Sequence, residues 1–159
     1  MPGRLFVVGT FDSTIETLLT VDLMRCLDEA GVPPAVVVFK RSNPSMNPAA
    51  PVAHRLDDAC TALHVDDFNA AETIDRIRAL APDLLVYAGG KDLLRKPLLD
   101  SARLGCLGGH YGQLPAVRGM SSVEWSVIAG VPMAVSVQRM STGVDMGDIV
   151  MRSAVPLFA

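Results

Sequence analysis

The sequence has few cysteines, and no two of them are spaced for a metal site or a disulfide framework. Cys26, Cys60 and Cys106 are far apart in a chain of 159 residues. Scattered single cysteines are typical of a reducing compartment, where thiols stay free and behave as small apolar side chains. We therefore expect a cytoplasmic protein. A nucleophilic role for Cys106 stays open, because it is close in sequence to His110.

An excess of positive charge and long apolar runs are also absent. The formal net charge is −3, so the sequence predicts no nucleic-acid partner. No apolar run reaches the roughly 18 residues of a membrane span, and the first one ends early, at Gly9. We expect neither a membrane anchor nor a secretory signal. Half of the residues are hydrophobic and 19% are charged, which indicates one globular domain over residues 1–159.

Several cofactor and catalytic motifs are missing. The sequence contains no G-x-G-x-x-G fingerprint, no P-loop and no G-x-S-x-G nucleophile elbow. Its three histidines, His54, His64 and His110, share no metal-ligand spacing, so we predict no metal site. These absences argue against a dinucleotide enzyme, a nucleotide hydrolase and a serine hydrolase.

Strand-like apolar runs alternate with helix-like segments along the chain. Runs at residues 4–9, 35–39, 82–90 and 105–110 predict buried strands, and segments at 13–31, 52–63, 69–80, 93–99 and 121–130 predict helices. The two final runs, "AVSVQRM" and "DIVMRSAVPL", alternate enough to predict a β-hairpin or antiparallel edge strands. The alternation predicts an α/β fold, a Rossmann-like open, mostly parallel twisted sheet with helices on both faces and an antiparallel C-terminal edge.

The starts of three helices are marked by the capping-box pattern. In each, a serine or asparagine stands three residues before a glutamate: Ser13 with Glu16, Asn69 with Glu72, and Ser121 with Glu124. The first helix is expected to turn an apolar face toward the sheet, formed by Ile15, Leu18, Leu19, Leu23 and Leu27.

Three glycine-containing segments follow strands and are expected at one edge of the sheet. They are Gly9-Thr10, Ala88–Gly90 and Gly108–His110. Ligands of open α/β sheets bind at the carboxyl ends of the strands. His110 at such an end is either a structural histidine bonded to backbone or a general acid/base. Asp145, between two glycines, is either a turn former or a carboxylate that orients His110.

The segment "GGHYGQLPAVRGMSSVEWSVIAG" followed by "VSVQRMSTGVDMGDIV" carries a histidine, a Leu-Pro step, a glycine and a Val-Asp-x-Gly turn in a defined order. Together with "RIRALAPDLLVYAGGKDLL", these segments resemble the folate-dependent formyltransferases. That family includes glycinamide ribonucleotide, methionyl-tRNA and sugar N-formyltransferases. The resemblance covers most of the chain from Val52 onward and implies transfer of a formyl group from 10-formyltetrahydrofolate to a primary amine of a small-molecule acceptor.

The resemblance assigns roles by position. His110 matches the catalytic histidine, and Asp145 matches the catalytic aspartate. The residues matched to the folate pocket are Ala88, Gly89, Gly90, Lys91, Leu93, Leu94 and Val144. We expect the acceptor to face Gly9, Thr10, Tyr111, Gly112 and the loop of residues 40–51.

Gly108 departs from the family, which has asparagine at this position of the catalytic set. The asparagine amide would stabilise the oxyanion that forms during transfer, and losing a comparable donor costs about 2.7–4 kcal/mol. Three consequences are open. Another group, Tyr111, Asn43 or Asn47, supplies the donor; the fold performs a different one-carbon reaction, such as hydrolysis of the donor; or the protein binds ligands with little catalysis.

The chain is shorter at its C-terminus than the family's catalytic domains. We expect exposed strand edges and uncovered apolar surface to favour a homo-oligomer, in which another chain could complete the site.

Overall fold

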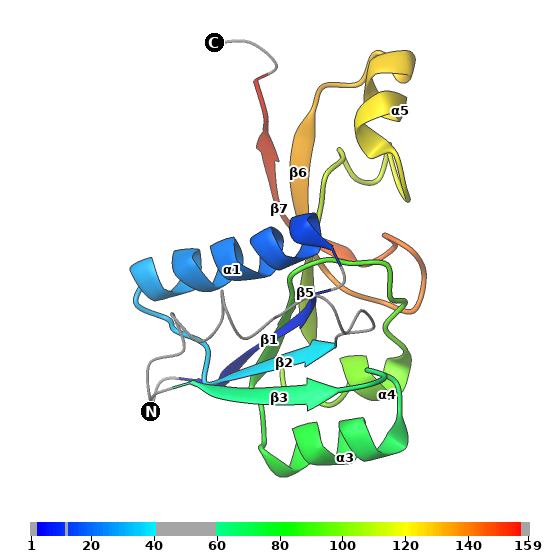
Figure 1. Ribbon diagram of the computed structural model, residues 1–159. Coiled ribbons are helices and arrows are strands. Elements are labelled where there is room, and N and C mark those ends of the chain that lie inside the picture. Colours follow the sequence, from blue (N-terminus) through cyan, green and yellow to red (C-terminus); the bar gives the residue numbers. More distant parts are fainter. Residues whose placement is uncertain (1–2, 12, 41–59, 157–159) are drawn as a thin grey trace. The chain divides into compact units, whose positions relative to one another are not determined.

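A computed structural model of the chain describes residues 3–11, 13–40 and 60–156 (Figure 1). The chain divides into two compact units, Met1–Cys106 and Leu107–Ala159. The predicted fold class is confirmed: strands alternate with helices, most strand pairs are parallel, and the C-terminal strands are antiparallel. Within the described residues, no helix has the length and apolar character needed to span a membrane.

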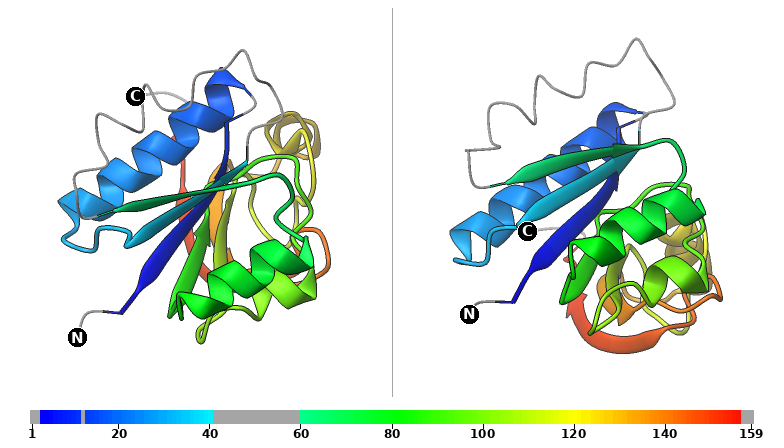
Figure 2. Two further views of the ribbon diagram at one scale, coloured as in Figure 1. Left: turned by 60° about the horizontal axis from the view of Figure 1, so that its bottom comes forward. Right: turned by 90° about the horizontal axis from the view of Figure 1, so that it is seen from below.

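Four parallel strands form the sheet of the first unit. They are β1 (Leu5–Thr10), β2 (Val36–Lys40), β3 (Thr61–Val65) and β4 (Leu84–Tyr87), in the order β3-β2-β1-β4. The helices of this unit are α1 (Thr14–Glu29), α3 (Ala71–Ala79) and α4 (Lys96–Leu99). Figure 2 shows α1 on one face of these strands, with α3 and α4 on the other. The helices therefore cover both faces of this sheet.

The two central strands β1 and β2 carry the core of the first unit. Phe6, Val7, Val8, Val37 and Val38 are fully buried. Strands covered on both faces need apolar side chains at consecutive positions, which explains the unbroken runs in the sequence. Each such side chain contributes about 1.5–3 kcal/mol when fully buried.

Helix α1 begins at the predicted capping box, but only part of its predicted apolar face turns inward: Leu23 and Leu27 pack against the core, and Ile15 and Leu18 do not. The Ser13 hydroxyl accepts a hydrogen bond from the Glu16 backbone N–H at 3.2 Å. The buried row is Glu16, Thr20 and Met24, each four residues after the last, whereas Ile15 and Leu18 are exposed. The expectation for Ile15 and Leu18 was therefore wrong.

The reason for this orientation is close packing of α1 on β1. A Cβ atom at Gly9 would lie 2.5 Å from Thr20 Oγ1, so the small side chain of Thr20 sits directly on the strand. The Thr20 hydroxyl donates to the Glu16 carbonyl at 3.0 Å and stays paired although buried. Close approach of the two backbones thus places Thr20 on the strand, although Leu23 and Leu27 of the apolar pattern still pack against the core.

One prediction for the segment after β2 needs correction. The helix expected over residues 52–63 is wrong at its end, because Thr61–Leu63 begin β3 and pair in parallel with Val36–Val38 of β2. Residues 52–59 lie outside the described residues. Pairing along a buried neighbour overrides the local helical pattern here.

Asn69 does not cap α3, whose N-cap residue is Ala70 without a side-chain hydrogen bond. Its amide instead donates to the Leu93 carbonyl at 3.0 Å and accepts from the Arg95 backbone N–H at 2.7 Å. Asn69 therefore holds the loop after β4 rather than a helix end.

The second unit contains antiparallel strands and one helix. β5 (Cys106–His110) begins at the boundary between the units, and β6 (Ala134–Arg139) pairs with it and with β7 (Asp148–Ala154). The predicted strand ending at His110 and the predicted C-terminal antiparallel strands are thus confirmed. A register shift between Val137 and Gln138 marks a bulge in the β6–β7 pair.

Helix α5 (Ser122–Ala129) presents its apolar side chains to solvent. Ser122 and Ser126 face inward, whereas Trp125, Val127 and Ile128 are 56%, 66% and 73% exposed. This is the reverse of the usual amphipathic helix. The capping box at Ser121 was wrong, because Ser121 has a φ of 54° and its side chain makes no cap hydrogen bond. The outer face of α5 is therefore an apolar surface within this unit.

Candidate active site

His110 lies at the end of β5 and contacts Asp145 within the second unit. Its Nδ1 atom is 3.2 Å from Asp145 Oδ2, and its Nε2 atom is 3.0 Å from the Val117 carbonyl oxygen. The ring is only 8% exposed. The two residues singled out in the sequence are therefore brought together by the fold, and their catalytic role stays a prediction.

Asp145 is held in a left-handed backbone conformation, with a φ of 50°. Aspartate is one of the non-glycine residues that tolerate this conformation in turns, as Ala81 and Ser121 of this chain also show positive φ angles. Its Oδ2 atom accepts the Gly119 backbone N–H at 2.9 Å, and its Oδ1 atom accepts the Gln138 Nε2–H at 2.8 Å. The carboxylate thus has one orientation, fixed by donors from separate segments.

Gln138 of β6 was missed by the sequence reasoning. Its amide donates to Asp145 and accepts the Gly147 backbone N–H at 2.9 Å, so both ends of the amide are fixed. The side chain is only 4% exposed. Two polar residues on one face of an apolar strand, Ser136 and Gln138, were the available signal, because a buried polar side chain needs a specific partner.

Replacing Gln138 with glutamate is expected to lower activity about tenfold at neutral pH. Two adjacent carboxylates repel each other, and the carboxylate next to the imidazole then loses its position. At lower pH the introduced glutamate and Asp145 share a proton and form a hydrogen bond that replaces the one from Gln138. The loss of activity relative to the wild-type protein then becomes smaller. The measurement is the pH profile of kcat for Gln138→Glu, compared with Gln138→Leu. An equal deficit of both variants at every pH would contradict this positioning role.

The loop after β5 wraps around the histidine ring. A Cβ atom at Gly112 would lie 2.6 Å from His110 Nε2, so only glycine permits the observed path. The buried Ser136 hydroxyl donates to the Gly112 carbonyl at 2.7 Å and accepts the Leu114 N–H at 3.1 Å. Arg152 of β7 donates to the Leu114 carbonyl. The glycine beyond the histidine therefore provides space for the ring.

Both ring nitrogens of His110 face oxygen atoms that can only accept. A neutral imidazole has one N–H, so only the doubly protonated ring donates to both partners. Asp145 thus holds the Nδ1 side of the ring and a backbone carbonyl meets the Nε2 side, so both the structural and the catalytic interpretation of His110 stay open.

The loop after β4 carries most of the residues predicted to bind folate. Gly90 has a φ of 140°, and a Cβ there would lie 2.8 Å from the Tyr87 hydroxyl and 3.0 Å from Thr10 Oγ1. The neighbouring Lys40 Nζ pairs with Asp92 at 2.5 Å, and Thr10 Oγ1 donates to the other Asp92 oxygen at 3.4 Å. Asp92 was not singled out in the sequence, although it fixes this loop to β1 and β2.

The remaining predicted binding residues differ in exposure. Leu93 is 69% exposed and Val144 is also exposed, whereas Leu94, Gly9 and Thr10 are buried. Tyr111 is exposed, and partial burial of its phenol raises the pKa, so the hydroxyl stays a donor at neutral pH. Asn43, Asn47 and the rest of the predicted acceptor loop after Lys40 lie outside the described residues.

Cys106 is unsuited to nucleophilic attack. Its thiol is buried, and burial raises its pKa to about 12. The thiolate is the reactive form, so a thiol of this kind is inert at neutral pH. Among the residues that the structure describes, no three histidine, cysteine, aspartate or glutamate side chains gather as metal ligands would.

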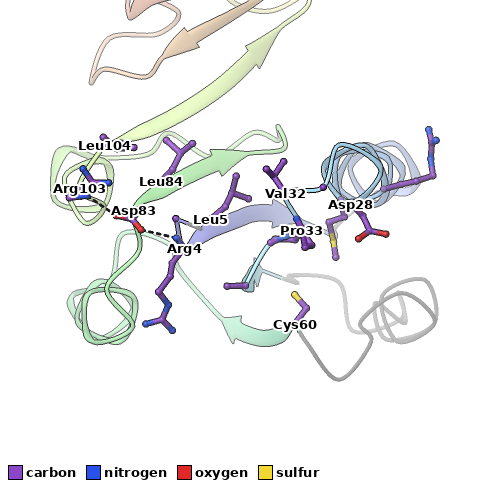
Figure 3. Close-up of a pocket in the computed structure, with 16 residues that line it drawn as sticks. Arg4, Leu5, Asp28, Val32, Pro33, Cys60, Asp83, Leu84, Arg103 and Leu104 are labelled. Atoms are coloured by element: carbon purple, nitrogen blue, oxygen red, sulfur yellow. Dashed lines mark hydrogen bonds and ion pairs between the residues drawn. The ribbon is translucent and has the colours of Figure 1, made fainter. Parts of the chain in front are cut away.

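A cavity of about 840 Å³ lies at the amino ends of β1 and β4 in the first unit (Figure 3). Its walls are mainly apolar. Its carboxylate Asp83 accepts the Arg4 backbone N–H at 2.8 Å and the Arg103 Nε–H at 2.7 Å, bonds that lower the pKa of this carboxyl. The predicted binding segments follow the carboxyl ends of these strands, so the cavity is separate from them.

The family comparison identifies the class of protein. Residues 29–159 match the model of the family described as "Formyl transferase". The chain therefore belongs to the formyl transferase family, as its motifs suggested.

A curated relative agrees with this membership, and solved structures share the fold. The chain is 32% identical to a methionyl-tRNA formyltransferase of Halorhodospira halophila, over 100% of this chain and 51% of that protein. It therefore spans about half the length of this relative. Similar folds include glycinamide ribonucleotide transformylase 1 from Symbiobacterium toebii, with a TM-score of 0.74 and 23% identity over 99% of this chain and 74% of that one. A sugar N-formyltransferase from Shewanella sp. FDAARGOS_354 has a TM-score of 0.64 and 18% identity, over 98% and 58% of the two chains.

Proposed function

We propose that the protein transfers a formyl group from 10-formyltetrahydrofolate to a primary amine of a small-molecule acceptor. The observation that carries this proposal is the contact between His110 and Asp145, at 3.2 Å, with the carboxylate fixed by Gln138 and Gly119. Family membership supports the reaction class, and the choice of acceptor is our inference.

The folate donor supplies the formyl carbon that the amine attacks, and tetrahydrofolate leaves. In this reaction the attacking amine loses a proton and the leaving nitrogen gains one. We propose that His110 Nε2 takes and returns this proton, which requires the Val117 carbonyl to leave its position 3.0 Å from Nε2. Asp145 keeps the proton on Nδ1 and balances the positive charge of the ring, as the carboxylate does in comparable triads.

The residues of the loop after β4 fit a flat, partly apolar donor. Leu93 offers an exposed apolar side chain, and Asn69 and Tyr87 hold the loop through its backbone carbonyls. We propose that Ala88–Leu94 bind the pterin, with Val144 also in contact. Gly112 and Tyr111 would face the acceptor, and Gly9 and Thr10 retain their assignment to acceptor binding.

Gly108 supports a second candidate function. The family has asparagine at this position, and glycine has no side chain to donate a hydrogen bond to the oxyanion. The protein would then be a regulatory homologue that binds folate with little turnover. A third reaction, hydrolysis of 10-formyltetrahydrofolate to formate, uses the same His110 with water as the nucleophile.

One assay separates these functions. The protein is incubated with 10-formyltetrahydrofolate and one of several amines, among them the acceptors in the relatives' names: methionyl-tRNA, glycinamide ribonucleotide and amino sugars. Formylated product that requires an amine supports the transferase, and product only from methionyl-tRNA would replace the small-molecule acceptor by a nucleic acid. Tetrahydrofolate released without an amine indicates hydrolysis. Donor binding without turnover, unchanged by Gly108→Asn, indicates the regulatory homologue.

We also propose that the protein is cytoplasmic and forms a homo-oligomer through α5. The exposed Trp125, Val127 and Ile128 support this, because apolar surface of this kind favours association. Trp125→Ser combined with Ile128→Ser is expected to shift the protein to monomers in light scattering. Ile15→Ser on α1 is the control for removal of an exposed apolar side chain. A monomeric wild-type protein would contradict the proposal.

A further inference from the structure

The space of a side chain at position 108 is occupied by Met140. A Cβ atom built on Gly108 would lie 2.7 Å from Met140 Sδ, 3.0 Å from Cγ and 3.7 Å from Cε. Gly108 is buried and Met140 is half-buried. In the ladder, Gly108 lies opposite Gln138, and Met140 follows two residues later, just beyond the end of β6. The methionine side chain therefore lies directly on the backbone of β5.

This contact lies beside the candidate active site. Gly108 and His110 are two residues apart on β5, so their Cβ directions point to the same face of the strand. Gln138, opposite Gly108, binds the Asp145 carboxylate. Met140 is only half-buried, so part of this residue is accessible to solvent.

We infer that Met140 is a specificity-determining residue, which fills the side-chain space of position 108 and makes the wall beside His110 apolar. This inference rests on the proposed function. A thioether donates no hydrogen bond and accepts only weakly, but it makes favourable contacts with apolar and aromatic groups. The side of the site formed by Met140 therefore contacts an apolar or aromatic part of a reactant rather than the oxyanion that forms during transfer. A polar side chain at position 108 requires Met140 to move away from β5 or to be shortened.

Thermal unfolding of a double-mutant cycle tests the contact without any need for activity. Gly108→Asn alone is expected to lower the unfolding temperature, and Met140→Ala in the same chain to restore it, with a coupling of about 2 °C or more. Met151→Ala on the exposed strand β7 is the matched control and should show no coupling. Gly108→Ala replaces Gly108→Asn if the larger residue prevents folding. Additive shifts in the Gly108–Met140 cycle would overturn the inference.

The acceptor preference tests the second part of the inference. The ratio of kcat/KM for benzylamine to that for ethanolamine is expected to fall about tenfold or more in Met140→Ser, because loss of apolar contact in a pocket has effects of this size. Met140→Leu should keep the ratio. An unchanged ratio in Met140→Ser overturns the assignment while leaving the transferase intact. A wild-type protein that transfers formyl to no amine contradicts the proposed function instead, and the unfolding cycle still reports on the contact.

Discussion

Replacing His110 with alanine is expected to lower the rate of formyl transfer by about 10²- to 10⁴-fold, the usual contribution of a general acid/base. The imidazole is the group that can move a proton between the attacking amine and the leaving nitrogen, and its Nδ1 side is already held by Asp145. The measurement is the single-turnover rate of formylated product with saturating donor and amine. Donor binding should change little, because the donor is assigned to the loop after β4.

His64→Ala is the control for this variant. His64 is an exposed residue of β3 in the first unit and has no assigned part in the reaction. Its replacement should leave the rate unchanged. The unfolding temperature of both variants is measured as well, because removal of the buried His110 ring leaves a cavity. A folded His110→Ala protein with the wild-type rate would remove His110 from the mechanism.

Replacing Asp145 with asparagine is expected to reduce kcat by a similar factor, about 10²- to 10⁴-fold, although the shape of the side chain is kept. The carboxylate oxygens accept from the Gly119 N–H, the Gln138 amide and the His110 ring. The amide of an asparagine at position 145 has only one oxygen, so its NH₂ group must face one of these hydrogen-bond donors. Rotation of the Gln138 amide would turn its oxygen toward the new NH₂ group, but this would break the hydrogen bond that the oxygen accepts from the Gly147 N–H. With its oxygen toward His110 and Gly119, the amide meets the NH₂ group of Gln138 and is pushed out of the position that orients the ring, and it carries no charge to stabilise a protonated ring.

Asp148→Asn provides the matched control for Asp145→Asn. Asp148 is an exposed aspartate at the start of β7. The Asp148 variant should keep the wild-type rate and pH profile. If Asp145→Asn does so too, the carboxylate is only a turn former, the alternative that the sequence left open.

The strands were largely predictable from the sequence, since apolar runs such as the one in β1 must be buried on both faces of a parallel sheet. Helix orientation was less predictable. The exposed Ile15 and the inward-facing Thr20 depart from the apolar pattern of α1, because Gly9 lets the helix backbone approach the strand. Leu23 and Leu27 pack against the core as predicted. The helix expected up to Leu63 gave way to β3, because pairing with β2 is a long-range contact that local patterns do not contain.

The candidate site shows the same division. The sequence pointed to His110 and Asp145 through their strand-end and turn positions, and the resemblance supplied their roles. It gave no indication that the Val117 carbonyl would meet the ring or that Asn69 would hold a loop instead of capping α3. Both depend on distances between segments that are far apart along the chain.

The amino-acid sequence by itself determined the α/β class, the family and most of the strands other than β3, because these follow from periodicity and from motifs read along one dimension. Only the tertiary structure decided which atoms surround the histidine: Gln138 and Gly119 on its carboxylate partner, and Met140 over Gly108. The physical reason is that hydrogen bonds and steric contacts depend on separations of a few ångströms, which folding sets between residues that the sequence keeps apart.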